Sequence, residues 1–185
     1  MTGRPPTRVS LDIEALTPAG VAACRPDLVA LLRDAVDSGA SIGFLPPLTE
    51  TEAQAYWGAV AAAIEEGSRV VLAARDWELG LVGSAQLDLA MRANAGHRAE
   101  VSKVMVHHRA RRRGIGRALM LALEAHARRL GRTTLVLDTR QGDPSEALYR
   151  ALGWSFAGAI PRYARSATGT LDATALYYKL LDPTR

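Results

Sequence analysis

The chain has 185 residues, 48% hydrophobic and 23% charged, a balance typical of a folded globular protein and not of a disordered one. Its single cysteine, Cys24, excludes an intramolecular disulfide, and its net charge of +4 admits an anionic ligand. Residues 1–8 lack the apolar core of a signal peptide and no apolar run approaches the roughly 20 residues of a membrane span, so we expect a cytoplasmic protein without a membrane partner.

The first half of the chain predicts one strand, two helices and a pair of strands. Residues 8–13 (RVSLDI) alternate between polar and apolar side chains, as a half-buried strand does. The pattern Thr49-x-x-Glu52 is a capping box that starts a helix. The predicted elements are strands at 8–13, 69–74 and 79–89 and helices at 27–38 and 49–66.

The second half predicts four strands and two helices. Residues 100–106 alternate, which places Val101, Lys103 and Met105 on one face of a strand. Residues 134–138 (TLVLD) are typical of a strand buried on both faces. The predicted elements are strands at 100–106, 134–138, 154–160 and 174–180 and helices at 114–130 and 145–152. The mixed order indicates one α/β domain over residues 8–182.

A basic, glycine-containing turn between a strand and a helix is the most informative feature of the sequence. Gly114 and Gly116 let backbone approach a ligand closely, and the free N–H groups of the helix that follows favour an anion. Arginines in this turn would add charge-assisted contacts to phosphate. The turn has neither the Gly-Lys-Ser/Thr of a Walker loop nor the G-x-G-x-x-G of a dinucleotide fold.

The pattern Arg111-x-x-Gly114-x-Gly116 resembles the pyrophosphate loop of the GCN5-related N-acetyltransferase (GNAT) superfamily. Residues 147–154 (ALYRALGW) look like the A-x-x-LY-x-x-x-GF segment of the same superfamily. Over most of the chain the resemblance is closer to the tabtoxin-resistance type of acetyltransferase. It rests on SGASIGF at 38–44, RAEV at 98–101, LDT at 137–139, G-x-IP-x-Y at 158–163 and ALYYK at 175–179.

The resemblance implies a fold, a co-substrate and a reaction. The fold is a mixed, mostly antiparallel seven-stranded sheet with splayed central strands and about four flanking helices. Acetyl-CoA would lie in the gap and donate its acetyl group to a primary amine of a small amino-acid-like molecule, in the manner of toxin or antibiotic detoxification. A homodimer is also implied. The implied coenzyme-binding residues are Val104, Met105, Val106, Arg111, Arg112, Arg113, Gly114, Ile115, Gly116, Arg117 and Tyr149. Gly142 stands where many members have asparagine.

Three residues are the catalytic candidates. Glu100 and Asp138 would face the acceptor pocket if their strands are neighbours, and a carboxylate there can accept a proton or hold an ammonium. Otherwise Glu100 is a solvated strand residue and Asp138 a cap of the following turn. Tyr149, with an ordinary pKa of about 10, is suited to reprotonate the thiolate, and is otherwise a core side chain. The resemblance also implies that residues 41–47 and 161–171 border the acceptor pocket, with Phe44 and Tyr163 as its walls; otherwise these two are packing residues.

We expect neither a metal nor a nucleic-acid partner. His107 and His108 are adjacent, and on an extended stretch adjacent side chains point opposite ways. No cluster has zinc spacing, and acetyl transfer requires no metal. Aromatic residues are few, with none at 98–132 to stack on bases. The alternatives left open are a protein or peptide N-acetyltransferase and a module that binds acetyl-CoA without catalysis.

Overall fold

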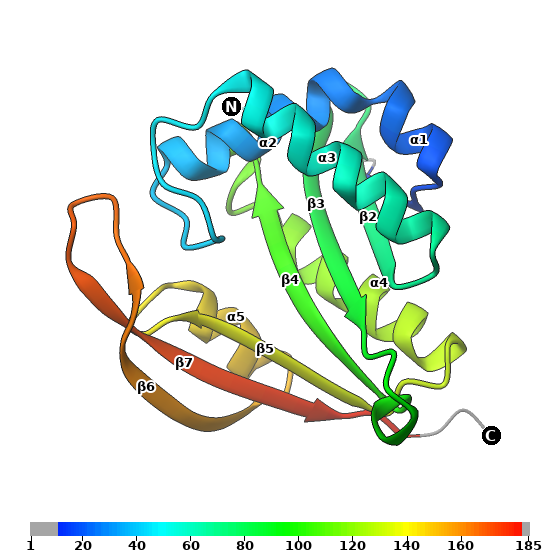
Figure 1. The fold of residues 1–185 in the computed structure, drawn as a ribbon, viewed down its shortest axis with the longest axis vertical. Helices are drawn as coiled ribbons and strands as arrows, with labels where there is room; N and C mark the ends of the chain where they lie inside the picture. The colour runs from blue at the N-terminus through cyan, green and yellow to red at the C-terminus, as the bar shows by residue number, and fades with distance from the viewer. Residues whose placement is uncertain (1–10, 183–185) are drawn as a thin grey trace, which may run out of the picture.

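The computed structural model describes residues 11–182, and within that range seven strands form one sheet with helices on both faces (Figure 1). Neighbouring strands follow the order β1-β2-β3-β4-β5-β7-β6, and only the β4–β5 pair is parallel. The strands are β1 (Leu11–Ala15), β2 (Arg69–Asp76), β3 (Gly80–Leu89), β4 (Arg98–Val106), β5 (Thr134–Arg140), β6 (Ser155–Arg165) and β7 (Leu171–Leu180). The helices are α1 (Pro18–Ala23), α2 (Arg25–Asp37), α3 (Glu50–Glu65), α4 (Ile115–Arg129) and α5 (Ser145–Ala151), with 3-10 turns η1 (Ala93–Ala95) and η2 (His108–Ala110). The predicted mixed, mostly antiparallel sheet is confirmed.

Each face of the sheet has its own hydrophobic core. Helices α1, α2 and α3 pack over one face, where the buried Trp57 donates its indole N–H to the carbonyl of Leu28 at 3.0 Å. Helix α4 covers the other face with a stripe that includes Ile115, Leu119 and Leu123. Burial on both sides fixes the sheet between two helical layers.

The helix boundaries follow capping signals. Thr49 forms the predicted capping box: its Oγ1 accepts from the N–H of Glu52 at 3.2 Å, and the Glu52 carboxylate accepts from the N–H of Thr49 at 2.9 Å. The helix expected at 27–38 begins two residues earlier, at Arg25. Helix α1 was not predicted, because its six residues are too few to show a hydrophobic period.

Three further differences concern the second half. The strand expected at 154–160 is longer than predicted, because β6 continues past a bulge to Arg165. Strand β5 buries only Leu135 and Leu137, so the expectation of burial on both faces is wrong. Residues 11–182 form five α-helices where about four were expected. None of the helices in this range is long and apolar enough to cross a membrane. Residues 8–10 of the first predicted strand, which also begin the predicted domain, lie outside the described range.

Candidate active site

The central strands β4 and β5 separate after a short stretch of pairing. Their parallel register covers three residue pairs, from Arg98–Thr134 to Glu100–Val136, after which the strands diverge (Figure 1). A cavity of about 310 Å³ lies where they part. Its lining side chains with chemical function are Ser41, Glu100, Ser102, Lys103, Asp138, Thr139, Asp143, Ser145, Tyr149 and Tyr163. This divergence is the splayed gap that the family resemblance implies.

Glu100 and Asp138, the two carboxylates expected at the site, line this cavity together. Both are exposed to it, and the Asp138 carboxylate accepts a 2.8 Å hydrogen bond from the hydroxyl of Thr174 on β7. Partial desolvation, together with the negative charges of Asp88 and Asp138, raises the pKa of Glu100 above its ordinary value. The site therefore holds one carboxylate of raised basicity next to a second that is fixed by a hydrogen bond.

Tyr149 forms another part of the cavity wall, from helix α5. It is 6% exposed, and its ring packs near Trp154 and Tyr177 at centroid distances of 6.3 and 6.0 Å. Burial raises the pKa of Tyr149 to about 12, so its phenol keeps its proton near neutral pH. The side chain is thus a core residue whose protonated phenol lines the cavity.

Lys103 also faces the cavity, although no sequence pattern assigned it a role. A β-bulge sets Lys103 and Val104 opposite a single residue of β3, because the register passes from Gln86–Ser102 to Ser84–Met105. Lys103 takes a positive φ of 49° there. Burial lowers the pKa of its ammonium. A lysine between Val101 and Met105, on an otherwise apolar predicted face, was the available signal in the sequence.

The bulge also overturns the predicted alternation of β4. Val101 packs in the core under α4, whereas Met105 packs in the core under α1–α3. The two residues therefore lie on opposite faces of the sheet, because one extra residue shifts the pleat by one position.

The two aromatic residues expected as walls lie in two adjoining cavities. Tyr163 lines the 310 Å³ cavity. Phe44 packs edge-to-face against Tyr56, with ring centroids 5.2 Å apart, and lines a neighbouring cavity of about 240 Å³ together with Arg140 and Arg165. The two cavities share the lining residues Ala40, Ser41, Gly43 and Ala164.

The turn before α4 has the backbone of an anion-binding loop. Arg112 and Gly114 take left-handed conformations, with φ of 63° and 80°. No side chain caps the N-terminus of α4, so the N–H groups of its first turn are available to a ligand. Nothing lies within 4 Å of the point where a Cβ on Gly114 would stand. These features fit a pyrophosphate group.

The arginines of this turn are not equivalent. The Nη2 of Arg113 lies 3.2 Å from a carboxylate oxygen of the buried Asp76, which directs Arg113 to the β2–β3 hairpin. The Nε of Arg111 donates to the carbonyl of Val106 at 3.2 Å. Arg112 and Arg117 are exposed. Arg113 is therefore engaged within the protein, while Arg112 and Arg117 are open to an anionic ligand.

Several residues expected at the coenzyme have buried side chains. Met105 and Ile115 are 2% and 1% exposed, so only their backbone can reach a ligand. Val104 and Val106 pack in part against the core. Gly142, at the position of the family asparagine, has φ of 85° and donates its N–H to the Glu146 carboxylate at 2.6 Å. That contact ties the loop before α5 to the helix without an asparagine side chain.

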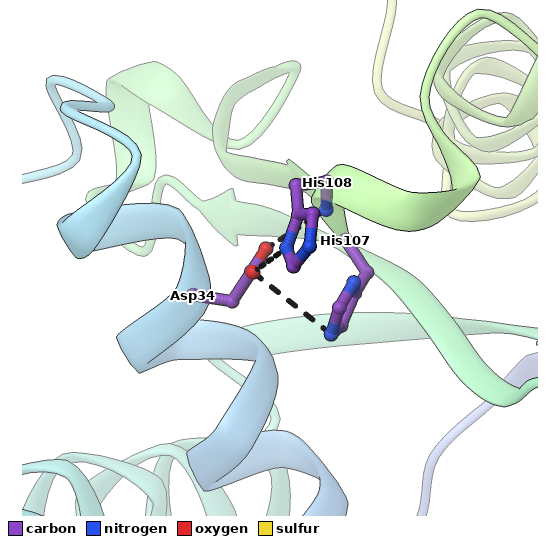
Figure 2. Close-up of side chains that lie close together, drawn as sticks. All are labelled: Asp34, His107 and His108. Atoms are coloured by element: carbon purple, nitrogen blue, oxygen red, sulfur yellow. Dashed lines mark hydrogen bonds and ion pairs between the residues drawn. The ribbon is translucent and has the colours of Figure 1, made fainter.

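His107 and His108 do not point in opposite directions as expected. Their ring centroids are 4.7 Å apart and their planes are inclined by 32°. Strand β4 ends at Val106, so the pair lies in the turn that enters η2, where the alternation of a strand does not apply. Both rings face Asp34 of α2 (Figure 2).

Comparison with known protein families agrees with the family resemblance seen in the sequence. Residues 32–154, which are 123 of the 185 residues, match the acetyltransferase (GNAT) family. The chain belongs to the GNAT family. This GNAT protein is accordingly an acetyl-CoA-dependent N-acetyltransferase, and its diverging strands and anion-binding loop are the features that suit acetyl-CoA.

Solved structures resemble this GNAT enzyme over nearly its whole length. The ribosomal-protein-alanine N-acetyltransferase from Brucella melitensis is 27% identical, with a TM-score of 0.76 over 92% of this chain and 99% of that chain. A GCN5-related N-acetyltransferase from Kribbella flavida is 23% identical, with a TM-score of 0.76 and coverage of 93% and 98%. The structure of yncA from Salmonella typhimurium with its cofactor acetyl-CoA is 21% identical, with a TM-score of 0.75 and coverage of 95% and 96%. The last two likenesses concern the fold alone.

Proposed function

We propose that this GNAT enzyme acetylates the primary amine of a small, amino-acid-like molecule. The observation that supports this proposal is the charge pattern of the 310 Å³ cavity, where Glu100 and Asp138 lie with Lys103. The carboxylates attract an ammonium group, and the lysine attracts a carboxylate. A zwitterionic substrate offers a partner to both kinds of charge, whereas a simple amine adds no carboxylate to the negative charges of Asp88, Asp138 and Glu100 around Lys103.

Acetyl-CoA, the co-substrate, supplies an acetyl thioester. We assign its pyrophosphate to the loop before α4 and its pantetheine arm to the backbone of β4 beyond the bulge. The open left-handed loop and the uncapped α4 support this assignment. The proposed contacts are the backbone of Val104, Met105, Val106 and Ile115, the loop Arg111, Arg112, Arg113, Gly114 and Gly116, the side chain of Arg117 and the phenol of Tyr149.

In the proposed reaction each polar side chain moves or holds one charge. Asp138, fixed by Thr174, holds the substrate ammonium. Glu100, with its raised pKa, accepts a proton from that ammonium, and the neutral amine then attacks the thioester carbonyl. Tyr149 donates its phenolic proton to the departing sulfur, and the second proton of the attacking amine, released as the amide forms, returns to the Tyr149 phenolate. Lys103 and the walls near Tyr163 and Phe44 orient the rest of the substrate.

The test is release of free thiol from acetyl-CoA with a panel of amino acids, their decarboxylated amines, polyamines, aminoglycosides and short peptides. We expect turnover of amino-acid-like compounds, and loss of kcat in Asp138→Asn and Glu100→Gln. Lys103→Met should raise KM for an amino acid but not for the matching decarboxylated amine. Preference for the decarboxylated amines by the wild-type enzyme would contradict the amino-acid-like substrate.

A protein or peptide amine is the second candidate substrate, favoured by the 27% identity to an enzyme named for acetylating alanine of a ribosomal protein. The same panel separates the two candidate substrates. A peptide acceptor should compete with small amino acids if both bind in the cavity. Efficient turnover of peptides alone would favour this candidate.

We also propose a homodimer and a detoxifying role, both on the resemblance to the tabtoxin-resistance type. Apolar side chains exposed on β6 and β7, namely Phe156, Ile160 and Leu180, are a surface that a second copy would cover. Sedimentation at twice the chain mass of 19.8 kDa would support the dimer. Sedimentation as a monomer would contradict it.

A further inference from the structure

Asp34, His107 and His108 form a cluster that the acetyl-transfer chemistry does not use. Asp34 lies near the end of α2, and the two histidines follow β4 directly. Candidate ligand atoms of the three side chains all lie within 4.8 Å of one another (Figure 2). None of the three lines the 310 Å³ cavity. We propose that Asp34, His107 and His108 form a binding site for a divalent transition-metal ion, with Zn²⁺ as its representative.

The donor set selects the class of ion. Two imidazole nitrogens and one carboxylate oxygen are ligands that Zn²⁺ accepts, with water completing a tetrahedron. Co²⁺, Ni²⁺ and Cu²⁺ share this preference for imidazole, whereas Mg²⁺ and Ca²⁺ favour oxygen ligands. The site therefore discriminates against the abundant hard cations.

The spacing of the ligand atoms is close to what a metal needs. Ligand distances of about 2.0–2.2 Å in a tetrahedron put the ligand atoms about 3.3–3.6 Å apart. The Nε2 of His107 lies 3.9 Å from Oδ1 of Asp34. The Nδ1 of His108 contacts the same oxygen directly, so this ring must move back to admit an ion. His108 is 52% exposed, which leaves its ring room to do so.

The surroundings already orient the carboxylate. Oδ2 of Asp34 accepts the backbone N–H of His108 at 2.9 Å, which leaves Oδ1 directed at the two rings. Outer hydrogen bonds of this kind support metal ligands. The N–H of Arg109 lies 3.3 Å from Nδ1 of His107, a long and exposed hydrogen bond. A metal bound at Nε2 leaves the ring proton on Nδ1, so Nδ1 no longer accepts this hydrogen bond. Water then accepts the N–H of Arg109 instead.

The position of the site gives metal binding a structural effect. Asp34 belongs to the helical layer on one face of the sheet, while His107 and His108 lead into the anion-binding turn at 111–114. An ion held by all three residues joins α2 to the segment that positions this turn. We expect the bound metal to raise the melting temperature and to slow amide exchange in residues 107–114.

The test uses the full chain after treatment with a chelator. Equilibrium dialysis against Zn²⁺ should give one ion per chain, and Co²⁺ should give the visible absorption of a four-coordinate complex. His108→Ala and Asp34→Asn should each weaken binding by at least about tenfold. His97→Ala, which removes an exposed histidine elsewhere, should leave it unchanged. Melting curves in chelator establish that each variant is folded.

Two outcomes would overturn the proposal. One is a wild-type chain that takes up no Zn²⁺, and the other is uptake that His108→Ala and Asp34→Asn do not weaken. In either case the cluster is only an ion pair between α2 and the turn after β4. The variants would then lower the melting temperature by the same amount with and without Zn²⁺. The readouts do not depend on acetyl transfer, so failure here is separate from failure of the proposed function.

Discussion

Glu100 and Asp138 lie in one cavity, but their surroundings suit them to different tasks. The Asp138 carboxylate receives a hydrogen bond from Thr174, which fixes its position. The carboxylate of Glu100 is partly desolvated and lies among other negative charges, which favours its neutral form. A base needs a pKa near the working pH, so the second environment is that of a proton acceptor.

The pH dependence of the reaction should follow the ionisation of Glu100. Activity requires the carboxylate to be ionised, so kcat/KM should rise with pH through a pKa above the ordinary 4.5 of glutamate. The steady-state pH profile of the wild type measures this rise of kcat/KM with pH (the acidic limb). Glu100→Gln should lower kcat and abolish the limb. An unchanged limb in the variant would assign the titration to another group.

Glu100 should also reduce stability at neutral pH. A raised pKa means that the folded protein binds a proton more tightly than the unfolded chain does, so stability falls as pH rises between the two pKa values. Glu100→Gln should therefore be more stable than wild type at pH 7 and equally stable below about pH 4. Urea unfolding at the two pH values measures the difference.

Tyr149→Phe should lower kcat and leave the KM for acetyl-CoA nearly unchanged. Loss of a general acid costs on the order of 10²-fold in rate, while the ring still fills its place in the core. Tyr177→Phe is the matched control, because Tyr177 packs beside Tyr149 but bonds Glu146 and does not line the cavity. Equal losses of kcat in the two variants would point to packing and not to proton donation.

At the scale of elements, the contact between β3, β4 and α4 decides where the loop before α4, the proposed coenzyme loop, lies. Gly83 of β3 lies beneath the first turns of α4, and a Cβ there would stand 3.0 Å from the carbonyl of Met105 and 3.1 Å from Ile115 and Leu119. The glycine thus permits a close approach of helix and sheet, which a side chain would push apart by a few tenths of an ångström. The bulge at Lys103 belongs to the same strand pair.

Gly83→Ala should destabilise the fold by about 1–3 kcal/mol, as overpacking of a core does, and should raise the KM for acetyl-CoA by displacing α4. Gly58→Ala, in the middle of α3 with nothing within 4 Å of the new Cβ, should instead stabilise the helix by up to about 1 kcal/mol. Chemical unfolding of both variants tests the sign. Stabilisation by both would contradict the close approach.

At the scale of the whole molecule, the splayed sheet needs a second connection between its halves, because β4 and β5 pair over only three residues. A buried polar cluster provides one. Lys179 of β7 lies 2.7 and 2.8 Å from the two carboxylate oxygens of Glu124 on α4, and 2.6 Å from the carbonyl of Leu152. Trp154 donates its indole N–H to the same carboxylate at 3.2 Å. Helix α4 packs on β1–β4, so the cluster joins it to the other half.

Lys179→Met should cost up to about 3–5 kcal/mol of unfolding free energy, because Glu124 would stay buried with only the more distant Arg128, 4.0 Å away, as a counter-charge. The double variant Lys179→Met with Glu124→Leu should recover most of this loss, since an apolar pair carries no desolvation penalty. Denaturant unfolding of the two variants measures the difference. A double variant no more stable than the single one would mean that packing, and not the buried charge, sets the cost.

The sequence by itself determined the order of most elements and nominated the loop before α4 as an anion-binding loop. Periodicity, capping residues and glycines are local signals, and each acts within a few residues, as the capping box at Thr49 and the turn at Gly114 do. Glu100, Asp138 and Tyr149, which lie around one cavity, were nominated through the resemblance to the GNAT superfamily and not by these local signals alone. The local sequence signal was too weak to predict the short helix α1 or the extension of β6 to Arg165.

Only the tertiary structure decided which side chains face one another across the sheet. The bulge in β4 depends on its pairing with β3, and it turns Lys103 into the cavity and Met105 into the opposite core. The meeting of His107 and His108 with Asp34 joins residues more than 70 positions apart. Register shifts and contacts of this kind are set by the packing of whole strands and helices, which leaves no mark in the local sequence pattern.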